Sequence, residues 1–304
     1  MVIADKFNQL YDSLLSEQTK RRSEAVILNI AIASFVIHLA IIYLVDFGII
    51  SFGSTSELLK NPIAAIYTPF SFILVYEVYL LILHLPRSIT TYISKQYEII
   101  TLIIIRRLFK DLSSLSLSDD WFKIKYDLQF TYDLVASILL FFLIYLFFRE
   151  SKKKYKQAET DERKIKSIAR FIELKKIIAV FLVLVIIFVA IYSFQSWLMG
   201  VIYPTHTAIV SFTSINNIFF EQFFTVLIIT DVFLLLFSLF HTDEIHKVIR
   251  NSGFIISTIL IRLSFSVTGL LNTVLIVLAI TFGLVVLLIH NKFEKYISTE
   301  RNNV

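Results

Sequence analysis

The chain has 304 residues, of which 57% are apolar and 17% are charged, and it carries a formal net charge of +5. A soluble globule of this length presents a more charged surface, so the composition excludes an ordinary soluble domain. The sequence contains no cysteine, which excludes disulfides, thiolate metal sites and thiol nucleophiles. Long apolar blocks instead predict an all-α integral membrane protein, because about 20 residues at about 1.5 Å each suffice to cross the hydrocarbon core.

Residues 1–24 precede the first apolar block and are predicted to lie in the cytoplasm. A basic run at residues 20–22 directly precedes the block, as expected for a cytoplasmic flank. Apolar side chains also recur at helical spacing, which predicts an amphipathic segment along the membrane surface. These side chains are Ile3, Phe7, Leu10, Tyr11 and Leu14.

The first half of the membrane region, residues 25–148, is predicted to hold four membrane helices. Three of its apolar blocks are long enough to span a bilayer, and the third in chain order is a shorter candidate. The four segments cover residues 25–45, 63–85, 99–109 and 130–148.

A basic linker, residues 149–176, separates the two halves. Its apolar residues at helical spacing predict an amphipathic helix on the cytoplasmic surface; they are Ile165, Ile168, Ala169 and Ile172. A lysine cluster at its start is predicted to contact anionic lipid headgroups. The alternative is that these charges only keep the linker in the cytosol. The cluster consists of Lys152, Lys153, Lys154 and Lys156.

The second half, residues 177–290, is predicted to repeat the first, and residues 291–304 form a cytoplasmic tail. FIISTILIRLSF aligns with EIITLIIIRRLF, which places Arg262 on Arg106, and the preceding helices align with Asp231 on Glu77. Lys154 and Tyr155 follow the fourth segment of the first half, and Lys295 and Tyr296 follow that of the second half. The repeats are therefore predicted to share one orientation in the membrane. The segments of this half cover residues 177–198, 218–240, 253–266 and 270–289.

The two short segments decide the topology. If both cross, there are eight helices with both termini in the cytosol, and most of the 29 basic residues lie on the cytosolic side. This distribution obeys the tendency of lysine and arginine to remain cytoplasmic. If neither crosses, the linker faces away from the basic flank of the first helix. We therefore predict eight membrane helices in two tandem four-helix repeats.

Four of the charges at membrane depth are predicted to form two pairs, Glu77 with Arg106 and Asp231 with Arg262. A lone charge at the bilayer centre costs at least about 2.5–3.5 kcal/mol, so such groups usually pair or line a wet cavity. Two interpretations stay open: the pairs join helices without conducting anything, or they border a path for protons or small ions.

Three further charges have no counterpart in the other half. Arg107 is expected to extend outward along its helix, whereas Glu98 and Glu221 are expected near the membrane interfaces. Asymmetric charges are positions where a duplicated protein can specialise. They are therefore secondary candidates for the functional site.

The segment HTDEIH, residues 241–246, resembles a metal site in composition. Histidines five positions apart do not share a helical face, so a solvated loop is the preferred interpretation. No metal or other cofactor is predicted.

The sequence therefore predicts a multi-pass protein of the cell membrane, a channel or transporter for protons, ions or a small solute. A pore between subunits of a homo-oligomer is compatible with this prediction, and nucleic acid is not an expected partner. The alternative is a scaffold or sensor that transports nothing and binds anionic lipid or a protein through its linker and termini. An enzyme is not expected, because no nucleophile and base converge.

Overall fold

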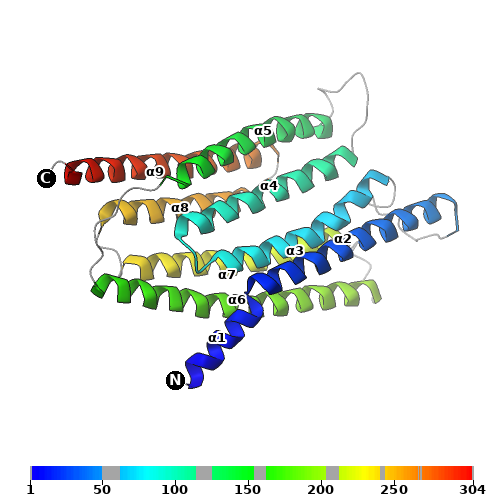
Figure 1. Ribbon diagram of the computed structural model, residues 1–304. Helices are drawn as coiled ribbons and strands as arrows, with labels where there is room; N and C mark the ends of the chain where they lie inside the picture. The colour runs from blue at the N-terminus through cyan, green and yellow to red at the C-terminus, as the bar shows by residue number, and fades with distance from the viewer. Residues whose placement is uncertain are drawn as a thin grey trace. The chain divides into compact units, whose positions relative to one another are not determined.

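The computed structural model describes residues 2–49, 62–113, 125–153, 162–202, 212–239, 244–265, 267 and 269–302. All regular structure in these residues is helical (Figure 1). The predicted all-α class is confirmed, and every predicted membrane segment overlaps a helix. The elements are α1 (Val2–Leu14), α2 (Glu17–Asp46), the short 3-10 helix η2 (Pro62–Ile66), α3 (Tyr67–His84), α4 (Ile89–Ser113), α5 (Lys125–Ser151), α6 (Glu162–Ile202), α7 (Phe212–Leu239), α8 (Ile245–Ser264) and α9 (Leu270–Asn302).

Three stretches of the described helices are long and apolar enough to cross a membrane. They are Gln9–Asp46, Leu128–Ser151 and Leu270–Glu300, and two shorter apolar helices cover Thr68–His84 and Thr225–Ser238. The prediction of eight crossings goes beyond this finding. The linker prediction is modified, because the described part of the linker from Glu162 onward is helical and continuous with the apolar block in the 41-residue helix α6.

Helix α2 shows why a lipid environment suits this chain. The helix begins after Ser16, whose side chain accepts a hydrogen bond from the Thr19 backbone N–H, and such a cap satisfies an N–H that has no partner inside the helix. Val26, Ile32 and Ile37 are each more than half exposed. Because an apolar surface of this extent is unfavourable in water, a bilayer is its natural environment.

The chain forms two compact units, each assembled from separate segments. Unit 1 comprises Met1–Leu83, Arg106–Leu115 and Ile178–Leu227; unit 2 comprises His84–Ile105, Ser116–Ile177 and Ile228–Val304. Helices α4, α6 and α7 each contribute residues to both units.

Unit 1 is joined by contacts between α2, η2 and α3. The ring nitrogen Nδ1 of His38 lies 2.5 Å from the Thr68 hydroxyl, and the Tyr76 hydroxyl donates to the Glu24 carboxylate at 3.2 Å. These bonds cross from one helix to the next, so they fix the relative register of α2 and α3 within this unit.

In unit 2, α9 packs against both α8 and α5 (Figure 1). Buried side chains recur every three or four residues on α5 and α9, as in two helices that pack along a common seam. On α5 they include Asp133, Ala136, Leu140, Ile144, Phe147 and Glu150; on α9 they include Thr273, Ile276, Ile280, Leu284, Leu287 and Asn291.

Helices α5 and α9 run parallel. Near their starts, the Thr273 hydroxyl donates to Asp133 at 2.6 Å, across 140 positions of sequence. Near the end of α5, the Asn291 side chain donates to the Glu150 carbonyl at 3.0 Å, across 141 positions. Because the separation is almost constant along both helices, they run in the same direction and nearly in register.

Aromatic side chains fill the centre of unit 2. Tyr97, Phe147 and Phe254 are fully buried. The rings of Tyr97 and Phe147 meet edge to face with centroids 4.8 Å apart, and Phe147 lies 5.6 Å from Phe254. This arrangement is favourable for aromatic rings and joins α4, α5 and α8.

Candidate functional site

One of the most enclosed charged groups in the described chain is Asp231 on α7. Its side chain is only 2% exposed. The Tyr92 hydroxyl donates to one carboxylate oxygen at 2.8 Å, and the Gln96 amide donates to the other at 3.1 Å. Tyr92 and Gln96 are four positions apart on α4, so both donors lie on one face of that helix.

Arg262 on α8 supplies the compensating charge. Its guanidinium is close enough to act electrostatically on the Asp231 carboxylate. A buried carboxylate is costly unless donors and an opposite charge satisfy it, and both kinds of group are present here. The prediction named Asp231 and Arg262 as partners but did not include Tyr92 and Gln96.

The other predicted pair lies in unit 1. Glu77 on α3 and Arg106 on α4 are both half-buried, and both belong to this unit. Each takes part in interactions with neighbouring groups. Arg107 is also half-buried and has partners of its own. The pairing of Glu77 with Arg106 stays a prediction.

The remaining secondary candidates have different positions. Glu98 is half-buried on α4 and forms an ion pair with Lys95, one helical turn earlier. This local pair satisfies the Glu98 charge within α4. Glu221 belongs to α7, but its side chain lies outside the described residues.

The predicted lipid-binding lysines are only partly described. Lys152 and Lys153 are exposed just after α5, and Lys153 forms a 2.7 Å ion pair with the buried carboxylate of Glu150. Lys154 and Lys156 lie outside the described residues. Lys152 therefore offers a charge to the solvent, whereas the charge of Lys153 is partly compensated.

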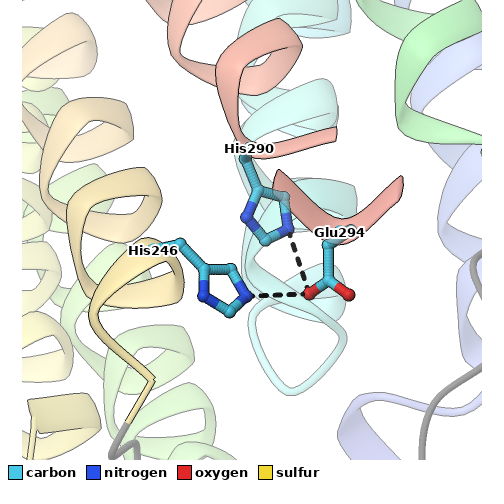
Figure 2. A group of neighbouring side chains, drawn as sticks. All are labelled: His246, His290 and Glu294. Carbon is cyan, nitrogen blue, oxygen red and sulfur yellow. Dashed lines mark hydrogen bonds and ion pairs between the residues drawn. The ribbon is translucent and has the colours of Figure 1, made fainter. Parts of the chain in front are cut away.

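A second group of polar side chains lies where α8 meets α9 (Figure 2). His246 Nε2 lies 3.1 Å from Glu294 Oε1, and His290 Nε2 lies 3.8 Å from the same oxygen. The three potential ligand atoms are within 4.8 Å of one another. We call His246, His290 and Glu294 the His–Glu cluster.

Two further charged residues border the His–Glu cluster. Arg250 Nη1 lies 3.0 Å from His290 Nε2, and a carboxylate oxygen of Glu244 lies 3.4 Å from His246 Nε2. Burial lowers the pKa of Arg250 to about 10, while Glu294 and Glu244 act in the opposite direction. Arg250 therefore remains a cation at neutral pH.

The His–Glu cluster was not predicted, because His246 was compared only with His241. His241 lies outside the described residues, and His246 falls in the first turn of α8. Its partners come from α9, where His290 and Glu294 are four positions apart and therefore share a helical face. That spacing was visible in the sequence.

Lys175 on α6 is a further buried ionisable group, 7% exposed. Its ammonium donates to the Arg87 carbonyl at 3.1 Å and lies 4.9 Å from the centre of the Phe171 ring. Burial lowers its pKa from 10.5 to about 8. The folded state thus binds this proton more weakly than the unfolded chain does.

We expect Lys175 to make stability rise with pH in one window. Between about pH 8 and 10.5 the unfolded chain binds more protons than the folded protein, so unfolding becomes harder as pH increases, by at most about 1.4 kcal/mol per pH unit. Thermal unfolding in detergent of the wild type and of Lys175→Met measures this. The melting temperature of the wild type should rise relative to that of Lys175→Met as pH increases from about 8 to 10.5. A difference in melting temperature that does not change with pH would contradict the expectation.

No protein-family model, curated protein or solved structure matches this chain. Its function is therefore argued from its own residues.

Proposed function

We propose that the chain is an eight-helix protein of the cell membrane, built from two tandem four-helix repeats, that moves protons or small ions through polar groups at membrane depth. The observation that carries the proposal is the enclosure of Asp231 by Tyr92, Gln96 and the charge of Arg262. Ionisable groups inside membranes are expensive, and they commonly mark ion or proton pathways.

The distribution of polar groups supports unit 2 as the conducting part. Among the side chains that the structure describes, every buried polar or charged one lies in unit 2. A structural role alone gives no reason for this one-sided distribution. Those within the predicted membrane segments include Asp133, Ser137, Asp231, Ser257, Thr258 and Thr273.

The parallel packing of α5 and α9 supports the eight-helix topology. If α6, α7 and α8 all cross the bilayer, three crossings separate these two helices and they must point the same way. If α8 does not cross, two crossings separate them and they must be antiparallel. Their contacts at separations of 140 and 141 positions are those of parallel helices.

The same packing supports the duplication. In repeats of one orientation, equivalent helices run in the same direction. α5 and α9 are the fourth helices of the two proposed repeats. The 141-position separation of Glu150 and Asn291 equals that of Lys154 and Lys295, which follow the two predicted fourth segments in the sequence. Equivalent positions of the two repeats therefore face each other.

Ion flux into liposomes tests the function. Vesicles containing the purified wild-type protein should pass protons or small cations faster than empty vesicles over a panel of ions. Asp231→Asn removes the buried charge and should change that flux about tenfold, which corresponds to a barrier change of about 1.4 kcal/mol. Glu150→Gln is the matched control, because its carboxylate is also buried but lies beyond the predicted membrane segment.

A second candidate function is binding of anionic lipid through the start of α6. Ile168 and Ile172 are 49% and 38% exposed, and Lys166 and Arg170 between and beside them are exposed as well. Such a basic amphipathic face suits a headgroup layer. If the wild type passes no ion faster than empty vesicles, transport is rejected, and retained binding to anionic vesicles would then favour this candidate.

A further inference from the structure

The His–Glu cluster has the ligand types of a transition-metal site. Two imidazoles and one carboxylate are the protein ligands of many zinc sites, in which a fourth position is left to water or another group. All three residues are held by helices, His246 by the first turn of α8 and His290 and Glu294 by α9. Helical residues keep their relative positions better than loop residues do.

The spacing of the ligand atoms also fits one small ion. In a tetrahedral zinc site with bonds of about 2.0–2.1 Å, neighbouring ligand atoms are about 3.3 Å apart. The distances from Glu294 Oε1 to the two histidine Nε2 atoms are 3.1 and 3.8 Å. All three ligand atoms lie within 4.8 Å of one another, so side-chain shifts of about 1 Å would bring them to the separations of a tetrahedral site.

Arg250 prepares His290 for this role. A guanidinium can only donate a hydrogen bond, so the 3.0 Å contact from Arg250 Nη1 requires His290 Nε2 to be an acceptor. His290 is then neutral, with its proton on Nδ1 and a lone pair on Nε2. This is the tautomer that binds a metal through Nε2.

We propose that His246, His290 and Glu294 bind a divalent transition cation of the zinc class, which displaces Arg250 from His290. Without a metal ion, the Arg250 guanidinium occupies the site. The metal ion and the guanidinium then compete for the lone pair on His290 Nε2. Glu244, 3.4 Å from His246 Nε2, is the candidate for the fourth ligand. The site joins α8 to α9 and does not depend on ion transport by the protein.

The test is zinc binding by tag-free protein, treated with a chelator and titrated in detergent against a fluorescent zinc indicator. We expect binding by the wild type, at least tenfold weaker binding by His246→Ala, His290→Ala and Glu294→Gln, and a zinc-dependent rise of the melting temperature that these variants lack. Glu294→Gln is nearly isosteric, so it tests the site even if an alanine variant fails to fold. His38→Ala, a histidine bonded to Thr68 in unit 1, is the control and should bind zinc like the wild type.

The variant Arg250→Gln tests whether the guanidinium competes with the metal ion for His290 or only lies near the site. If the guanidinium occupies the metal position, its removal should tighten zinc binding severalfold. Weaker binding by this variant would overturn the displacement. Failure of the wild type to bind zinc at micromolar concentrations, or equal binding by the three ligand variants, would overturn the site itself.

Discussion

Replacing Gly283 by alanine is expected to destabilise unit 2 by about 2–3 kcal/mol. Gly283 lies inside α9, where a change from glycine to alanine ordinarily stabilises a helix by about 1 kcal/mol. Here a Cβ atom would overlap the Tyr97 hydroxyl and lie 3.1 Å from Ser257 Oγ. Gly283→Ala is therefore expected to destabilise the protein, although the same substitution ordinarily stabilises a helix.

The Tyr97 hydroxyl cannot easily move aside. It lies 2.7 Å from Ser257 Oγ, and that hydroxyl donates to the Ala279 carbonyl at 2.6 Å. Since serine has a single hydroxyl proton, Tyr97 must be the donor of the first bond. The ring itself is fully buried against Phe147, so a shift of Tyr97 would disturb both the hydrogen bonds and the aromatic packing.

A double variant tests this explanation. Tyr97→Phe removes the overlapping oxygen, so Gly283→Ala should cost clearly less in the Tyr97→Phe background than in the wild type. Gly253→Ala is the matched control, because its Cβ would meet Val286 at 2.8 Å; Val286→Ala, and not Tyr97→Phe, should relieve it. Thermal unfolding in detergent, followed by circular dichroism, measures each step. A Gly283→Ala protein as stable as the wild type would show that α4 and α9 do not approach each other in this way.

The sequence was sufficient to predict the helices and to identify the charged residues inside the apolar blocks. Apolar blocks of this length have few other stable states, and a charge inside one is conspicuous because it is costly. Tyr92 and Gln96 were missed because both precede the predicted membrane segment at residues 99–109. In the structure Ser88 accepts a hydrogen bond from the Thr91 N–H, so α4 begins at Ile89 and includes both donors.

The sequence pattern could not predict which helices contact each other. Helices that are apolar on most of their surface give no periodicity that identifies the face toward a given neighbour. His246 could therefore not be assigned to His290 and Glu294, and Thr273 could not be assigned to Asp133. These partners depend on which helices pack together, whereas the spacing of His290 and Glu294 on one helix could have been noticed.

The parallel pairing of α5 with α9 leads to a prediction with an almost all-or-none outcome. Ala136 and Ile276 are buried and follow Asp133 and Thr273 by three positions on each helix. Cysteines at these two positions should form a disulfide in nearly every molecule under mild oxidation. The chain has no native cysteine, so no other thiol can interfere.

The control is a pair that an in-register parallel arrangement forbids. The control pair places cysteines at Ala136 and Leu287. Leu287 lies eleven positions, about 16 Å, beyond Ile276 along α9, whereas the Cα atoms of a disulfide are about 4.4–6.8 Å apart. A protease site inserted after Lys153 reports the result, because after cleavage only a disulfide holds the two fragments together on a denaturing gel.

The result bears on the proposed topology as much as on the packing. Disulfide formation by the first pair and not by the second requires α5 and α9 to enter the membrane from the same side. Because α6, α7 and α8 connect them, an odd number of these helices must then cross. With α6 and α7 both crossing, α8 must cross as well, although it is short and contains Arg262 within its apolar part. If instead the second pair cross-links as well as the first, α5 and α9 are not in register, and the eight-helix topology loses its strongest structural support.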